Sequence, residues 1–329
     1  MVGGSMNILI MAAGAVGGYF GSVLSTSNDV TFVARGEHLR KIQECGLSVK
    51  SVTSGNYVCR SKAYKEPPPE YRADLAIFCV KDYQNDEASE IMANSISDNT
   101  TILTLQNGLG SGEFLSQKFG SEKVVLGAAY VEASKGEPGE IFEHGGVCRI
   151  TFGKQSDLQD GRIKELANIF ESSNIDFTVS ENIHDALWQK LVFISALSGM
   201  TCITKSTFRE VMNNPSTRNI TISLVRETAS VASEIVSNFS KDTVQNTIDY
   251  LETHKNDLVS SMHQDMLSGR PMEINAINGA VSREGKTLGV PTPINDFQVD
   301  YSSLIDETIE QCRRCIKTCC PAGPWKLTQ

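Results

Sequence analysis

The chain has 329 residues, of which 40% are hydrophobic and 21% are charged, and its formal net charge is −9. This composition is typical of a globular protein with one large or two ordinary domains. The net negative charge argues against nucleic acid as a partner. No uninterrupted apolar run approaches the roughly 20 residues that a helix needs to cross a bilayer, so we predict no membrane partner.

Cysteine usage bears on the compartment and on metal binding. The chain has nine cysteines and no secretory signal, and we expect residues 1–5 to be an expression-tag remnant ahead of a native start at Met6. These features predict a reducing compartment, the cytoplasm. We expect free thiols and no metal site, because Cys320 falls off the helical face shared by its neighbours Cys312, Cys315 and Cys319.

The N-terminal region carries the most informative pattern of the chain. Residues 8–11 are a short apolar run, a glycine-containing turn follows, residues 19–24 have the pattern of a helix, and residues 30–35 that of a second strand. A dinucleotide-binding βαβ unit has this order, because glycine lets a pyrophosphate approach the backbone and the helix N-terminus offers unpaired N–H groups. The alternative is a structural glycine turn in an unrelated α/β protein. We favour nucleotide binding and predict as cofactor-binding residues Ala12, Ala13, Gly14, Ala15, Val16 and Gly17.

The glycine turn departs from the G-x-G-x-x-G spacing at its first position. The three positions of that spacing are Ala12, Gly14 and Gly17, so alanine stands where the tight turn usually has glycine. Alanine is tolerated without strain only where φ is negative. We therefore expect Ala12 to have a negative φ.

The end of the second strand bears on the choice of cofactor. NAD-binding proteins usually carry Asp or Glu there, since a carboxylate accepts a hydrogen bond from the ribose 2′-OH. This chain has Arg35 instead, and the first acidic residue after it is Glu37. A guanidinium pairs with a 2′-phosphate, so we predict NADP(H) as the cofactor. The alternative is a solvated surface arginine.

The two halves of the chain differ in their hydrophobic patterns. Near-continuous apolar runs at 73–80 and 101–105 are typical of central strands in a parallel sheet. From Ile183 onward, apolar residues recur at helical spacing. We therefore predict an α/β Rossmann-type doubly wound parallel sheet domain that binds NADP at residues 1–181, and an all-α substrate domain at 182–329. Further strands are predicted at 47–50, 124–126, 139–142, 148–152 and 176–179.

Several segments outside the glycine turn carry polar side chains suited to chemistry. Lys81 and Asn107 follow two predicted central strands, where doubly wound sheets place their ligands. The short segments that contain them belong to an ordered set of motifs over about residues 6–300. This set resembles that of the ketopantoate reductase (2-dehydropantoate 2-reductase) family. The set consists of GAVGGYFG, VARG, VK, QNG, WQKL, SSMHQD and EINAING.

The resemblance implies a Rossmann domain followed by a helical domain, with NADPH delivering hydride to the 2-oxo carbon of a short, branched 2-oxo acid. It implies that Lys190, in the WQKL segment, donates the proton. An ammonium suits this role, because it stabilises a developing alkoxide and then protonates it. The alternative is a surface lysine on an amphipathic helix. Glu273 is implied as a second catalytic residue that also contacts the cofactor.

The resemblance also implies further binding residues. Lys81, Asn107 and the backbone of Ala133 are expected to contact the cofactor. Ser261 is expected to contact the substrate, together with Lys190. For Asn107 the alternative is a turn residue ahead of a glycine.

Four positions depart from the family pattern. The family has asparagines one and two turns after the lysine, and these positions hold Ile194 and Ser198, which we keep as substrate-site positions. Two more substrate asparagines correspond to Phe208 and Leu258. A pocket that has lost polar partners discriminates hydroxylated substrates less strongly, so the identity of the 2-oxo acid is open.

The implied function is NADPH-dependent reduction of 2-dehydropantoate (ketopantoate) to pantoate in pantothenate biosynthesis. Its partner is a small 2-oxo acid, and homodimers are among the assemblies that family members form. Two alternatives stay open. One is a paralogous NADPH-dependent reductase of another 2-oxo acid, and the other is a non-catalytic sensor that binds NADP(H).

Overall fold

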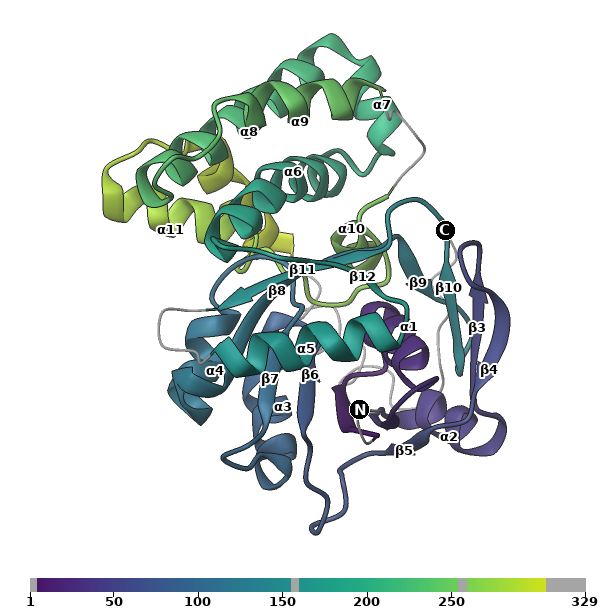
Figure 1. Ribbon diagram of the computed structural model, residues 1–329. Helices are drawn as coiled ribbons and strands as arrows, with labels where there is room; N and C mark the ends of the chain where they lie inside the picture. The colour runs from purple at the N-terminus through teal and green to yellow at the C-terminus, as the bar shows by residue number, and fades with distance from the viewer. Residues whose placement is uncertain (1–4, 155–159, 254–258, 306–329) are drawn as a thin grey trace, which may run out of the picture. The chain divides into compact units, whose positions relative to one another are not determined.

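The computed structural model describes residues 5–154, 160–253 and 259–305 (Figure 1). The chain forms two compact units, Met1–Leu191 and Val192–Gln329. The predicted domain boundary at 181/182 stays a prediction. The cysteine cluster predicted to hold free thiols lies outside the described residues.

The first unit is built on an eight-stranded sheet. Neighbouring strands are parallel except β8 and β11, which are antiparallel. A parallel connection needs a crossover, usually a helix, whereas the segment between β8 and β11 forms strands of another sheet. The predicted doubly wound α/β fold is confirmed, with this one antiparallel pair. In spatial order the strands are β12 (Asp176–Val179), β11 (Arg149–Lys154), β8 (Val124–Tyr130), β7 (Thr101–Thr104), β6 (Leu75–Phe78), β1 (Asn7–Met11), β2 (Asp29–Val33) and β5 (Lys62–Tyr64).

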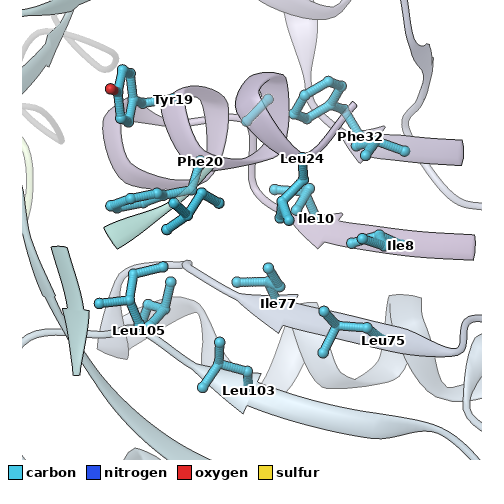
Figure 2. Close-up of a cluster of buried hydrophobic side chains, with 14 of the residues drawn as sticks. Ile8, Ile10, Tyr19, Phe20, Leu24, Phe32, Leu75, Ile77, Leu103 and Leu105 are labelled. Carbon is cyan, nitrogen blue, oxygen red and sulfur yellow. The ribbon is translucent and has the colours of Figure 1, made fainter. Parts of the chain in front are cut away.

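Helices cover both faces of the large sheet. Ile8 and Ile10 of β1 belong to a core with side chains of α1 and α5, whereas Leu9 and Met11 belong to a core with α3 and α4. Successive side chains of a strand point to opposite faces, so a strand covered on both sides needs an unbroken apolar run. Figure 2 shows the first of these cores, between α1 and the central strands. The helices are α1 (Ala15–Leu24), α2 (Gly36–Cys45), α3 (Asn85–Met92), α4 (Ser111–Phe119) and α5 (Asp160–Ser172), with short 3-10 turns η1 (Asp82–Gln84), η2 (Ala93–Ser95) and η3 (Ser121–Lys123).

A second, four-stranded sheet in this unit is not predicted by the sequence. Two of its strands are predicted, but β3 pairs with β10, which is distant along the chain, and local patterns carry no signal for that pairing. The buried Glu143 carboxylate accepts hydrogen bonds from Ser51 Oγ (2.5 Å), Thr53 N (3.0 Å) and Gly145 N (2.5 Å). Burial alone would raise the pKa of Glu143, but these hydrogen bonds hold it below its usual value. In spatial order the strands are β4 (Gly55–Cys59), β3 (Leu47–Ser51), β10 (Glu140–Glu143) and β9 (Ala133–Lys135).

The second unit is helical in the part that the structure describes, as the sequence predicts. Its core contains Val192 of α6, Phe208 of α7, Leu224 of α8 and Ile248 of α9. The helices are α6 (Ile183–Thr204), which begins in the first unit, α7 (Phe208–Asn213), α8 (Pro215–Ile235), α9 (Asp242–Thr253), α10 (Ser261–Leu267), α11 (Asn278–Leu288) and a helical stretch at residues 293–305.

Helix α6 has 22 residues and a mean hydropathy of 1.4 in its most apolar window. By length and composition it meets the test for a membrane span, a result that the search for uninterrupted apolar runs does not anticipate. However, 61% of that window is buried within the protein. Core helices of soluble proteins pass the same test, so α6 is weak evidence for a membrane span. Its first turn is capped by Asn182, whose Oδ1 accepts a hydrogen bond from Asp185 N (3.4 Å).

The expected negative φ of Ala12 is wrong, because its φ is +78°. In this left-handed region the Cβ of an L-residue crowds the backbone, at a cost of roughly 1–2 kcal/mol. Hydrogen bonds on both sides hold the turn: Ala13 N donates to Val33 O (2.9 Å) and Cys79 N donates to Met11 O (3.0 Å). The turn therefore keeps a geometry that suits glycine, although alanine occupies the position.

Replacing Ala12 by glycine should stabilise the first unit by about 0.5–1 kcal/mol, because the relief of strain exceeds the added freedom of the unfolded chain. The urea midpoint of unfolding, followed by circular dichroism, measures the effect. Ala13→Gly is the matched control, since Ala13 is buried and has no positive φ. That control should lower the midpoint, and a lower midpoint for Ala12→Gly as well would contradict the assignment of strain.

Candidate active site

The glycine turn places the N-terminus of α1 at the carboxyl end of β1. Gly14 is the N-cap residue, with φ −78° and ψ −164°, and no side chain caps the helix. The first helical hydrogen bond runs from Gly18 N to Gly14 O (2.7 Å). The amides of Ala15, Val16 and Gly17 therefore have no partner within the helix, as in every first turn. Such a terminus attracts anions, and phosphates in particular.

The two glycines of the turn are required for different reasons. A Cβ on Gly17 would overlap the backbone oxygen of Ala12 and lie 2.9 Å from Ile10 Cγ2, so this glycine is required by packing within the protein. A Cβ on Gly14 would meet no atom within 4 Å, and its φ suits any residue. Nothing in the fold requires glycine at position 14. The missing side chain leaves open space beside unpaired amides, and a dinucleotide pyrophosphate fits this surrounding.

Arg35 lies at the end of β2, where the sequence analysis expects it, and it is engaged with a carboxylate. Its Nη1 lies 2.9 Å from Glu87 Oε2, at the start of α3. The two side chains are 42% and 59% exposed, and pairs exposed to this degree contribute about 0–1 kcal/mol. The Arg35 guanidinium is therefore partly exposed and paired with Glu87.

Lys190 lies in the first part of α6 and is held by groups of the first unit. Its Nζ donates to Asn107 Oδ1 (2.8 Å) and to Ala129 O (2.7 Å), and it lies 5.5 Å from the centre of the Tyr130 ring. An amide oxygen, a carbonyl and an aromatic face each favour the charged form of a lysine. The side chain is half-buried, unlike that of a freely solvated surface lysine.

These contacts lie on the edge of the sheet that also holds the glycine turn. Strands β8, β7, β6 and β1 are consecutive and parallel, so their carboxyl ends meet at one edge. The turn follows β1, Lys81 comes after β6, Asn107 follows β7, and Tyr130 ends β8. Ligands of open α/β sheets bind at this edge. A dinucleotide lying along it from the turn would run toward the lysine.

Two neighbouring groups at this edge are kept in their protonated forms. Burial raises the pKa of Tyr130, against a smaller lowering by the charge of Arg149. Burial also raises the pKa of Cys79, which follows β6, to about 12. A thiol attacks only as the thiolate, so Cys79 is no nucleophile at neutral pH.

Residues that the sequence analysis missed also contribute to this edge of the sheet. Gln106 is buried, and its Nε2 donates to Val80 O and to Asn85 Oδ1, both at 2.8 Å, which ties together the loops that follow β6 and β7. Ala129 and Tyr130 also contact the lysine ammonium. Gln106 stands in the QNG segment, but its partners are distant in sequence, and only the fold reveals them.

The predicted residues of the second unit have varied surroundings. Glu273 is 3% exposed and Ser198 is 6% exposed. Ile194 is half-buried, and Ser261 is exposed at the start of α10. Phe208 belongs to the hydrophobic core of this unit. Leu258 lies outside the described residues.

Two further predictions concern the cofactor and metals. Ala133 is the first residue of β9 and pairs with Glu143 of β10, in the small sheet. Its predicted backbone contact with the cofactor stays a prediction, as do the roles of Glu273 and Ser261. Within the described ranges, no group of three or more His, Cys, Asp or Glu side chains is placed to hold a metal ion.

A glycine turn ahead of α1 and a lysine ammonium on the same edge of a doubly wound sheet form the arrangement expected of a dinucleotide-dependent oxidoreductase. Comparison with known proteins agrees. The profile described as ketopantoate reductase PanE/ApbA matches residues 8–157, and the profile of its C-terminal part matches residues 182–305. The chain belongs to this family, and it is an oxidoreductase that acts on a CH–OH group with a nicotinamide dinucleotide cofactor.

Individual relatives cover nearly the whole chain. A 2-dehydropantoate 2-reductase of Halobacterium salinarum is 26% identical over 292 residues, which make up 88% of this chain and 95% of that protein. The crystal structure of a 2-dehydropantoate 2-reductase from Geobacter metallireducens is 28% identical, with a TM-score of 0.85 over 92% of this chain and all of the other. The ternary structure of D-mandelate dehydrogenase with NADH and anilino(oxo)acetate is 26% identical, with a TM-score of 0.85 over 93% of this chain and 99% of the other.

Proposed function

We propose that this protein reduces ketopantoate to pantoate with NADPH and serves pantothenate biosynthesis. The observation that carries the proposal is the position of Lys190. Its ammonium is fixed by Asn107 and Ala129 at the carboxyl edge of the sheet, on the same edge as the glycine turn. A carbonyl reduction requires a proton donor at the reacting oxygen.

The proposed mechanism assigns each step to a residue of this chain. The turn at Gly14 and the first amides of α1 hold the pyrophosphate, and the bound nicotinamide supplies the hydride. As charge develops on the 2-oxo oxygen, the ammonium of Lys190 stabilises it and then transfers a proton to it. Asn107 and Ala129 keep the ammonium charged and oriented. Glu273 is proposed as a second catalytic residue.

We propose NADPH over NADH because Arg35 follows β2 by two residues and no acidic residue stands at that point. Glu87 limits this preference, since it holds the guanidinium through the contact of 2.9 Å. Glu87→Gln should therefore lower the Kd for NADPH by about two- to fivefold, the range of an exposed ion pair, and leave the Kd for NADH unchanged. Isothermal titration with both cofactors measures the two values.

Arg35→Gln is the reciprocal control for this prediction. It should raise the Kd for NADPH by about tenfold and leave NADH binding unaltered, because only the 2′-phosphate loses a charged partner. If both variants bind both cofactors as the unaltered protein does, Arg35 takes no part in cofactor selection.

The substrate is the less constrained half of the proposal. Ile194, which is half-buried, removes a polar group from a position that carries asparagine in the family pattern, and D-mandelate dehydrogenase is a structural neighbour at 26% identity. These observations favour a second candidate, reduction of another 2-oxo acid with a bulkier apolar substituent. For either reaction we propose a cytoplasmic enzyme. The five cysteines in the described part of the chain are free thiols, which suits a reducing compartment.

The test is the consumption of NADPH with ketopantoate and with a panel of 2-oxo acids that have branched, straight and aromatic substituents. The proposal expects the largest kcat/KM for ketopantoate. A larger value for an aromatic 2-oxo acid would establish the second candidate. No turnover with any member, despite tight NADPH binding, would favour a sensor that binds the cofactor without catalysis.

A further inference from the structure

His38 of α2 connects the glycine turn to the small sheet. The side chain is 8% exposed. Its Nε2 lies 2.8 Å from Ala13 O, and its Nδ1 lies 2.9 Å from Gly139 N. The two partners are far apart in sequence: Ala13 belongs to the turn after β1, and Gly139 immediately precedes β10. One imidazole thus ties two separate parts of the first unit together.

The two partners determine the state of the ring. A carbonyl oxygen can only accept, so Nε2 carries the proton, and a backbone N–H can only donate, so Nδ1 is bare. His38 is therefore neutral. Burial lowers its pKa, the nearby charge of Lys135 lowers it further, and only the Ala13 carbonyl acts in the opposite direction. The neutral ring is thus the stable form at physiological pH.

The hydrogen bond to Ala13 also orients the next amide. The Ala13–Gly14 peptide bond is trans, so the Gly14 N–H points opposite to the Ala13 C=O within one rigid plane. Ala13 N is already bound to Val33 O (2.9 Å). With His38 on the carbonyl, the Ala13 residue is held from both sides, and the rotation of the plane that carries the Gly14 amide is set.

This restraint matters because the turn lacks its usual first glycine. Ala12 has a φ of +78°, so a relaxed turn would move toward a negative φ and rotate the following peptide planes. The hydrogen bond from His38 opposes that rotation at the adjacent residue.

We propose that His38 is a positioning residue for the cofactor: by holding the Ala13 carbonyl, it orients the N-cap amide and the first turn of α1 toward the pyrophosphate. This inference rests on the proposed use of a nicotinamide dinucleotide. Both ring nitrogens of His38 are bound to backbone groups, so neither is left for a 2′-phosphate or for the reacting atoms. The loss of His38 therefore weakens the binding of NADPH and of NADH by the same factor and leaves kcat at saturating cofactor unchanged.

Three substitutions separate the two hydrogen bonds. His38→Gln keeps a donor near the position of Nε2, His38→Asn keeps an acceptor near the position of Nδ1, and His38→Phe keeps the ring without either. The Kd values for NADPH and NADH, measured by isothermal titration, should rise roughly three- to tenfold for the Asn and Phe variants, as expected for a lost neutral hydrogen bond. The Gln variant should stay within twofold of the unaltered protein.

A control on the same helix distinguishes positioning from general loss of stability. Gln43 Nε2 donates to Ala63 O (2.9 Å), so Gln43→Leu removes one side-chain hydrogen bond of α2 that does not involve the turn. It should lower the melting temperature without changing either Kd. Equal Kd values for the unaltered, Asn and Phe proteins would overturn the role of His38, and so would an effect on NADPH alone. Failure of the unaltered protein to bind either cofactor would instead overturn the proposed function.

Discussion

Replacing Lys190 by methionine should lower kcat by about 10²–10⁴-fold, the usual contribution of a general acid, and leave the Kd for NADPH within about twofold. Methionine keeps the length of the side chain and removes its charge and proton. The ammonium contacts Asn107 and Ala129, and neither contact contributes to the glycine turn where the pyrophosphate is expected. The reaction should therefore lose its donor while the cofactor site stays intact. Single-turnover kinetics with saturating NADPH measure the chemical step directly.

Gln189→Met is the matched control, because Gln189 is the neighbouring residue of α6 and is exposed. Its Nε2 donates to Asp185 Oδ2 (2.8 Å) on the helix surface. This variant should retain full activity. If Lys190→Met also retains activity within threefold, the proton comes from another group or from water, and the assignment of Lys190 as the donor is wrong.

Replacing Gly17 by alanine should destabilise the first unit by about 3 kcal/mol and abolish measurable NADPH binding. The added Cβ would overlap the Ala12 oxygen and crowd Ile10 Cγ2 at 2.9 Å. Overpacking of this kind costs about 1–3 kcal/mol or more. Ala12 cannot yield readily, because its φ of +78° is already unfavourable and its neighbours are hydrogen-bonded. Urea unfolding and cofactor titration measure the two effects.

Gly14→Ala is the informative comparison, because its Cβ meets no protein atom within 4 Å. Its unfolding free energy should stay within about 1 kcal/mol of the unaltered value. Its NADPH affinity should nevertheless fall by at least tenfold, since the methyl group enters the space assigned to the pyrophosphate. A Gly14→Ala variant that binds NADPH normally would show that the pyrophosphate lies elsewhere.

The parts of the fold that follow from local patterns are predictable from the sequence. The turn between β1 and α1, the unbroken apolar run of β6 and the helical spacing after Ile183 each produce the predicted element, because each depends on residues close together in the chain. The small sheet is not predictable in this way, since β3 pairs with the distant β10. Local rules also predict the wrong sign for the φ of Ala12, because hydrogen bonds from Ala13 N to Val33 O and from Cys79 N to Met11 O impose the observed value.

The candidate site is likewise predictable from the sequence only in part. Lys190 and Asn107 are found from their segments, but their contact at 2.8 Å depends on the arrangement of the strands. Tyr130 carries no signal in the sequence, because an aromatic residue at the end of a strand is ordinary. The ion pair between Arg35 and Glu87 could not be predicted either, because the two residues belong to different elements.

The measurement that tests the central claim most directly is the transfer of deuterium from NADPH deuterated at C4 of the nicotinamide to a 2-oxo acid. The account predicts a 2-hydroxy acid with deuterium on C2, formed in equal amount to the NADPH consumed, and far more slowly with Lys190→Met. A 2-hydroxy acid without deuterium from either C4 epimer of the cofactor, or cofactor oxidation without this product, would contradict direct hydride transfer and the function proposed for this chain.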